Sequence, residues 1–170
     1  LNAQSPGLFK IPYRPEMLIH CRSNLMLSSV NPGIVGQYLS DIPFQVSFAL
    51  QLDETAEVAD IVLPDTHYLE RLDPIANHPT QVRPGPGYWY FASRQPVVEP
   101  PAGVRQWSGV LLELADRAGF LNDVYMTLNV GLDLKEPFRL DFGSRYTWGE
   151  LSDRYLKSTL GPHHGLQWFK

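Results

Sequence analysis

The sequence predicts an α/β fold built on a parallel sheet. Three short apolar runs, each typical of a buried strand, occur at residues 17–21, 44–50 and 60–64. A helical pattern over residues 31–40 separates the first two runs, and a short acidic turn at 53–58 separates the last two. Strands that alternate with helices in this way favour parallel pairing through crossover connections.

The helix of residues 31–40 has clear start and stop signals. Asn31 is a suitable N-cap, and Pro32 is favoured in the first turn of a helix. Pro43 ends the pattern. Asp53 is the expected cap of the short acidic turn, because carboxylates suit the positive end of a helix. The apolar residues that recur at helical spacing are Ile34, Val35, Tyr38 and Leu39.

A proline-rich loop follows, and it leads into the best helical pattern of the chain. Prolines recur from residue 74 onward; we expect an aromatic strand or packing segment at 88–92 and extended chain at 95–101. The helix runs from Val104 to Ala118 and ends at Gly119. Its predicted buried face consists of Trp107, Val110, Leu111, Leu114 and Ala118.

Two further helices are predicted, over residues 122–129 and 147–160. Thr147 and Glu150 have the spacing of a capping box at the start of the second. The expected organisation is an irregular lead-in at 1–15, a βαβαβ segment at 16–72, a Pro-rich loop at 73–101 and a helical remainder at 102–170.

Composition excludes several classes of function. A net charge of −4 without a block of like charges argues against nucleic-acid binding. No apolar run reaches the roughly 18–20 residues of a membrane helix. The single cysteine, Cys21, excludes an internal disulfide framework, a Cys-cluster zinc site and a self-contained iron–sulfur cluster. A start at Leu1 and an aromatic end at Trp168–Lys170 lead us to expect a piece of a longer protein.

Polar residues follow each predicted strand, where ligands of parallel sheets usually bind. Ser23 and Asn24 offer hydroxyl and amide groups to a ribose or phosphate. The amides around Thr55 begin a helix, where an anion is favoured. The alternative for each residue is a cap or a turn. The candidate binding residues at this edge are Arg22, Ser23, Asn24, Phe48, Gln51 and Thr55.

An acidic cluster around the third strand is a second candidate site. An acid–base pair for hydrolysis would be drawn from Asp60, Asp65 and Glu70, with His67 beside them. The alternative is that these carboxylates cap helices and bond loop amides, and Asp60 is expected to have such a structural role.

The two adjacent histidines and the single cysteine are weaker candidates for a metal site and for a nucleophile. His163 and His164 are adjacent, so they point apart, and no further His or Cys near them completes a metal site. Cys21 ends an apolar strand, which favours a buried and unreactive thiol.

The stretch from Phe44 to Asp73 resembles a signature of the molybdopterin-dependent oxidoreductases of the dimethyl sulfoxide reductase family. The segments that carry the resemblance are Asp53-Glu54-Thr55-Ala56, Ala59-Asp60-Ile61-Val62-Leu63-Pro64, Tyr68-Leu69-Glu70-Arg71 and Arg94-Gln95-Pro96-Val97-Val98-Glu99-Pro100. The resemblance covers residues 15–120. Within the family, these motifs are most similar to those of the thiosulfate/polysulfide-reductase-like or phenylacetyl-CoA-oxidoreductase-like branch.

This resemblance implies a Rossmann-like segment of a dinucleotide-binding domain. The family holds molybdenum or tungsten between two pterin guanine dinucleotides (bis-molybdopterin guanine dinucleotide), and this segment would help hold the nucleotide end of one. The metal ligand and any iron–sulfur cluster would lie elsewhere in the catalytic subunit. The implied partners are the rest of that subunit and an iron–sulfur electron-transfer subunit, in the cytoplasm or periplasm of a prokaryote. The alternative is a non-catalytic nucleotide-fold binding or scaffold module.

Two positions depart from the family pattern. Ala49 stands where many members have an aspartate that binds guanine, and Leu25 replaces a proline in the turn after the first strand. The missing carboxylate removes charge-assisted hydrogen bonds worth about 1.5–3 kcal/mol. Guanine recognition would then depend on the backbone of residues 48–51 or on another acid such as Asp53.

Overall fold

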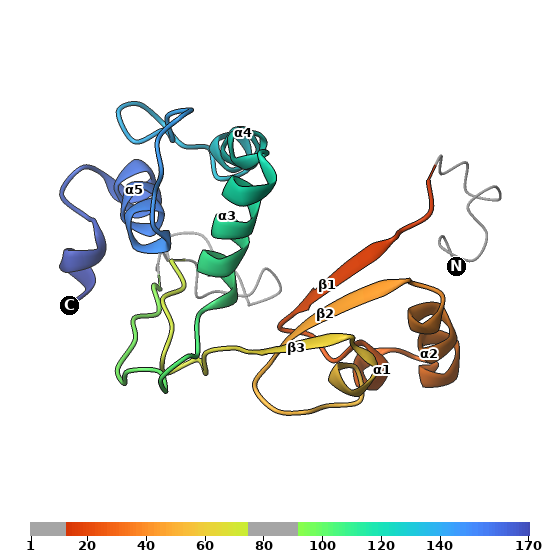
Figure 1. Cartoon of the computed structure of the whole chain (residues 1–170). Helices are drawn as coiled ribbons and strands as arrows, with labels where there is room; N and C mark the ends of the chain where they lie inside the picture. Colours follow the sequence, from red (N-terminus) through yellow and green to blue (C-terminus); the bar gives the residue numbers. More distant parts are fainter. Residues whose placement is uncertain (1–12, 75–91) are drawn as a thin grey trace. The chain divides into compact units, whose positions relative to one another are not determined.

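A computed structural model of the chain describes residues 13–74 and 92–170, which form two compact units (Figure 1). We call residues 13–65 the strand unit, and residues 66–74 with 92–170 the helical unit. The division after Asp65 falls earlier than the expected boundary after residue 72. Most of the expected lead-in and of the aromatic segment at 88–92 lies outside the described residues.

The strand unit contains a three-stranded parallel sheet. Its strands are β1 (Met17–Cys21), β2 (Phe44–Ala49) and β3 (Ile61–Pro64), in the order β1–β2–β3. Both pairings are parallel, with Ile19 opposite Val46 in the first. The prediction of a parallel α/β arrangement is therefore confirmed.

Helix α2 (Pro32–Ser40) connects β1 to β2. The Asn31 side chain accepts a hydrogen bond from the Ile34 amide at 3.2 Å, so the predicted cap is present. The short helix α1 (Leu25–Ser28) precedes α2 and was not predicted. The acidic turn before β3 contains the single 3₁₀ turn η1 (Ala56–Val58).

The central strand β2 is the most buried part of the strand unit. Val46 and Phe48 are buried together with Leu39 and Ile42 from the end of α2. Gln45 is also buried, and its side-chain amide donates to the Leu39 carbonyl at 2.8 Å. Because this polar group has an internal partner, its burial costs little.

The helical unit consists of α3 (Trp107–Ala118), α4 (Leu121–Gly131), α5 (Trp148–Leu160) and the 3₁₀ turn η2 (Leu166–Phe169). Gly119 ends α3 in the left-handed region, with φ +83°, as predicted. The buried cluster at its centre comprises Tyr125, Leu134, Leu140, Leu151, Tyr155 and Leu156.

The predicted capping box of α5 is present in both directions. The Glu150 amide donates to the Thr147 hydroxyl at 3.2 Å, and the Thr147 amide donates to the Glu150 carboxylate at 2.8 Å. These bonds hold the pKa of Glu150 below its usual value, which keeps the carboxylate charged beside the helix N-terminus.

The buried face predicted for α3 is wrong. Leu114 is 42% exposed, whereas Ser108 and Ala115 are buried, and Leu112 packs against the central cluster. Two small residues, Ser108 and Ala115, are therefore the buried positions of α3. The sequence pattern selected the largest apolar side chains, and Trp107 is only partly buried.

Candidate functional site

The carboxyl ends of the three strands lie at one edge of the sheet, because the strands are parallel and in register. Cys21 lies opposite Phe48, and Ala49 lies opposite Pro64. The polar segments that follow the strands therefore meet at this edge, as the sequence predicted. We call it the strand-end edge; it contains residues 22–24, 49–55 and 65.

Asn24 connects the segments that follow β1 and β2. Its Oδ1 accepts from the Leu27 amide at 3.2 Å and from the Thr55 hydroxyl at 2.8 Å. Its Nδ2 donates to the Glu54 carboxylate at 2.6 Å. Asn24 is thus the N-cap of α1, and it connects two loops by hydrogen bonds. A capping role is the alternative that the sequence analysis gave for this residue.

Thr55 is a structural residue rather than a surface for a ligand. Its side chain is fully buried, and its hydroxyl accepts from the Met26 amide at 3.1 Å while donating to Asn24. Its own amide and that of Ala56 donate to Asp53 Oδ1, at 3.1 and 2.8 Å. Asp53 therefore occupies the two amides that were expected to receive an anion, and Thr55 has the structural role that the sequence offered as its alternative.

The remaining candidates differ in access to solvent. Arg22, Ser23 and Gln51 are exposed, whereas the Phe48 side chain is buried in the sheet and leaves only its backbone near the edge. Arg22 has φ +59°, a left-handed conformation that few non-glycine residues adopt. This conformation occurs directly after the last residue of β1, where the strand ends.

The strand-end edge has more acidic than basic groups. Arg22 is accompanied there by Asp53, Glu54 and Asp65. The hydrogen bond from Asn24 holds the pKa of Glu54 below its usual value, so this exposed carboxylate is charged at neutral pH. The edge offers one cation to a phosphate and a carboxylate acceptor to the N–H groups of a base.

Cys21, at the end of β1, is a half-buried free cysteine. Burial raises the pKa of its thiol to about 11, and the nearby negative charge of Asp65 adds to the effect. A protonated thiol is a poor nucleophile and a poor metal ligand, which agrees with the predicted unreactive side chain.

The structure does not assemble the acidic cluster predicted around β3. Asp60 and Asp65 stand at opposite ends of the strand, about 16 Å apart at the usual rise per residue. Asp60 accepts from the Gln45 amide at 2.7 Å, which is the structural role expected of it. The Glu70 carboxylate accepts from the His67 amide at 2.9 Å within a turn, which is the loop-amide bond given above as the alternative to catalysis.

The described residues contain no group of three or more His, Cys, Asp or Glu side chains placed to hold a metal ion. His164 lies partly buried against Trp168, with ring centroids 4.7 Å apart, and His163 is exposed. No helix among residues 13–74 and 92–170 is both long and apolar enough to span a bilayer.

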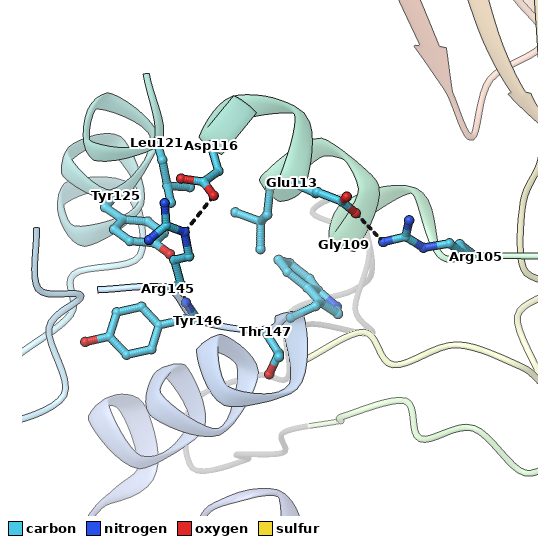
Figure 2. Close-up of a pocket in the computed structure, with 11 residues that line it drawn as sticks. Arg105, Gly109, Glu113, Asp116, Leu121, Tyr125, Arg145, Tyr146 and Thr147 are labelled. Carbon is cyan, nitrogen blue, oxygen red and sulfur yellow. Dashed lines mark hydrogen bonds and ion pairs between the residues drawn. The ribbon is translucent and has the colours of Figure 1, made fainter. Parts of the chain in front are cut away.

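The helical unit contains a pocket of about 290 Å³ that the sequence did not indicate. It lies among α3, α4 and the start of α5, and Figure 2 shows ion pairs along its rim, Arg105–Glu113 and Arg145–Asp116. Arg105, Gly109, Leu112, Glu113 and Asp116 recur at helical spacing on the α3 side. That spacing is visible in the sequence, but a mixture of charges, a glycine and a leucine is typical of a solvated helix face.

Comparison of the chain with models of protein families, with curated proteins and with solved structures finds no match. The resemblance described above therefore stays a prediction, and the structure by itself establishes an α/β architecture with a parallel three-stranded sheet.

Proposed function

We propose that the chain is part of the catalytic subunit of a molybdenum or tungsten oxidoreductase, in which the strand unit helps to hold one pterin guanine dinucleotide. The observation that carries this proposal is the strand-end edge. Three parallel strands bring Arg22, Ser23, Gln51 and Glu54 to one side of the sheet. This edge lies within the segment whose motifs resemble the family, and ligands of parallel sheets bind at such edges.

The groups at this edge suit the nucleotide end of the cofactor. In this proposal, the exposed Arg22 guanidinium binds a phosphate, and the exposed Ser23 hydroxyl binds a ribose oxygen. Glu54 supplies the charged acceptor that Ala49 lacks, for the N1–H and N2–H₂ donors of guanine. Asp53 is less suitable, because two backbone amides occupy its Oδ1 and its side chain is only partly exposed. Glu54 is exposed and has one bonded oxygen, the Oε2 that accepts from Asn24.

The metal would be held by other parts of the subunit, since the described residues contain no metal-binding group. The metal centre supplies the two-electron redox chemistry in this proposal, and an iron–sulfur cluster elsewhere in the subunit or in a partner subunit would carry electrons. The strand unit binds and orients the nucleotide, and this chain alone is expected to have no redox activity.

The test of the binding edge is a nuclear magnetic resonance titration of the 170-residue chain with GMP, with AMP as control. We expect weak binding, with GMP-induced shifts at Arg22, Ser23, Gln51 and Glu54. Glu54→Gln is expected to reduce the preference for GMP over AMP. Glu57→Gln, at an exposed acid on η1, is the matched control. Shifts confined to His163 and His164 would contradict the proposed site.

The alternative is a nucleotide-binding or scaffold module without a metal, which would use the same edge. Metal analysis of the full-length protein, purified without oxygen, separates the two. Molybdenum or tungsten in stoichiometric amount supports the oxidoreductase, and its absence together with GMP binding supports the module. The hydrolase hypothesis is not retained, because Asp60 and Asp65 lie apart.

A further inference from the structure

The side-chain amide of Asn24 bonds directly to Glu54, the acid assigned above to the guanine base. Its Nδ2 donates to the Glu54 carboxylate at 2.6 Å. The two residues are 30 positions apart, one in the segment after β1 and the other in the segment after β2. Glu54 is exposed and Asn24 is half-buried, so the bond links an acid at the surface to a side chain held within the strand unit.

The orientation of the Asn24 amide is set by its other partners. The Leu27 backbone N–H only donates, so the Asn24 atom that it faces at 3.2 Å is the oxygen. The Thr55 hydroxyl accepts from the Met26 amide and donates its own hydrogen to the same oxygen at 2.8 Å. A flipped amide would set its NH₂ group against the Leu27 N–H, donor against donor. Nδ2 therefore faces Glu54.

This bond restrains the Glu54 carboxylate and leaves part of it available. Oε2 accepts from Asn24, and Oε1 accepts no hydrogen bond from the other described residues. Each carboxylate oxygen has two lone pairs, so Oε2 is also able to accept from a second donor. The Asn24 bond, followed by the backbone amide of Glu54 itself, holds the pKa of this carboxyl below its usual value. Glu54 is therefore a charged acceptor with a defined position.

A restrained carboxylate discriminates guanine from adenine. Guanine presents two neighbouring donors, N1–H and N2–H₂, whereas adenine presents an N1 acceptor beside its N6 donor. A carboxylate accepts from both guanine donors, but it repels the lone pair of adenine N1. The discrimination depends on where the two oxygens stand, because a freely rotating glutamate turns toward any donor within reach.

We infer that Asn24 is the positioning residue for guanine recognition: it holds Glu54 Oε2 so that the carboxylate accepts from N1–H and N2–H₂ together. Asn24 acts through Glu54 and does not itself bind the base, because its oxygen already accepts from two donors of the strand unit. This inference rests on the proposed function, which assigns the guanine to the strand-end edge.

The variant that tests this inference is Asn24→Asp, which keeps the helix cap and reverses the contact with Glu54. Asn and Asp are similar N-caps, so the new carboxylate still accepts from the Leu27 amide and the Thr55 hydroxyl. Its second oxygen replaces Nδ2 and repels the Glu54 carboxylate. Asn31→Asp is the matched control, because Asn31 caps α2 through a backbone amide and the substitution adds the same charge to the strand unit.

Nuclear magnetic resonance titrations of the 170-residue chain with GMP and AMP measure recognition. The two nucleotides share ribose and phosphate, so the ratio of their affinities reports the base alone. We expect the unsubstituted chain to favour GMP by roughly three- to tenfold, and Asn24→Asp to favour it by less than about twofold, as Glu54→Gln does. Asn31→Asp should keep the original ratio. In the Glu54→Gln background, Asn24→Asp should change the ratio no further, since Asn24 acts only through that carboxylate.

The pKa of Glu54, followed through the ¹³C shift of its side-chain carboxyl, separates positioning from a loss of structure. We expect Asn24→Asp to raise this pKa above the ordinary value of 4.5, because a like charge then stands beside the carboxylate. Local unfolding would return the pKa only to that ordinary value. Asn31→Asp should leave it below.

The outcomes distinguish this inference from the proposed function. A preference for GMP that Glu54→Gln removes and Asn24→Asp keeps would overturn the role of Asn24 and leave the proposed function intact. Equal affinities of the unsubstituted chain for GMP and AMP would contradict the guanine site, and the role of Asn24 with it. An unchanged Glu54 pKa in Asn24→Asp would show that the two side chains do not interact, which also overturns the inference.

Discussion

The strand unit and the helical unit differ in the interactions that stabilise each of them internally. In the strand unit, polar side chains make specific internal bonds. Asn24 accepts from the distant Thr55 hydroxyl, Asp53 accepts from the nearby Ala56 amide, and Gln45 donates to the Leu39 carbonyl. In the helical unit, a buried aliphatic and aromatic cluster occupies the centre and ion pairs lie around it.

The two units differ in charge as well. The strand unit has two basic and seven acidic residues, whereas the described part of the helical unit has ten basic and eleven acidic residues. The strand unit thus combines a small apolar core with specific polar bonds at an acidic surface, whereas the helical unit has the larger apolar cluster under a balanced surface. Substitutions that remove one kind of contact should therefore have different effects in the two units.

The largest effect is expected in the centre of the helical unit. Leu151 is fully buried in the cluster, so Leu151→Ala should lower the free energy of unfolding by about 2–5 kcal/mol. Leu114→Ala is the control; Leu114 is 42% exposed, and its loss should cost less than about 1 kcal/mol. Urea titration followed by circular dichroism measures both. A loss of 2 kcal/mol or more for Leu114→Ala would instead support the buried face of α3 that the sequence pattern predicted.

The second prediction concerns the thiol of the strand unit. The pKa of Cys21 is raised from 9.0 to about 11, so at pH 8 its thiolate fraction is about 100-fold smaller than that of an unperturbed cysteine. Alkylation by iodoacetamide at pH 8 should be slower than that of glutathione by a similar factor. Asp65→Asn should restore only the smaller part of the rate, because burial is the main cause of the shift.

The same shift has a consequence for stability. A thiol whose pKa is higher in the folded chain than in the unfolded one stabilises the fold fully below pH 9, and this contribution is lost as the pH rises toward 11. Cys21→Ala should therefore lessen the fall in stability between pH 9 and 11. An unchanged pH profile would contradict the raised pKa.

The third prediction compares two asparagines of the strand unit that both cap helices. Asn31 makes one side-chain bond, to the Ile34 amide, so Asn31→Ala should cost about 1 kcal/mol. Asn24 also accepts from the buried Thr55 hydroxyl, so Asn24→Ala should cost about 2 kcal/mol or more. Urea titration of both variants measures the two losses of unfolding free energy. Equal losses would mean that the hydrogen bond between Asn24 and Thr55 adds no stability.

These comparisons show which parts of the molecule could be predicted from sequence. The elements depend on residues that are neighbours in the chain, so local signals indicated them correctly. The apolar runs indicated the strands, and Asn31–Pro32 indicated the start of α2. Gly119 indicated the end of α3, and the Thr147–Glu150 pair indicated the start of α5. The role of Thr55 depends on Asn24, which is far away in the chain. The sequence therefore located the strand-end edge but did not show which of its polar groups already have partners.

Two features of the helical unit were not predicted, for a related reason. The face that a helix buries depends on how its neighbours pack, and α3 uses Ser108 and Ala115 where the pattern favoured Leu114. The pocket depends on residues from three helices and a loop, and no single segment indicates it. Local signals define elements, whereas sites arise from the packing of several elements.

The smallest effects are expected at two glycines of α3, with opposite signs. Gly109 has ordinary helical geometry and open space at its Cβ, so Gly109→Ala should stabilise the chain by about 0.5–1 kcal/mol. Gly119 has φ +83°, so Gly119→Ala should destabilise it by about 1 kcal/mol. Differential scanning calorimetry measures both as shifts of Tm. A lower Tm for Gly109→Ala, or an unchanged Tm for Gly119→Ala, would contradict this pair of expectations.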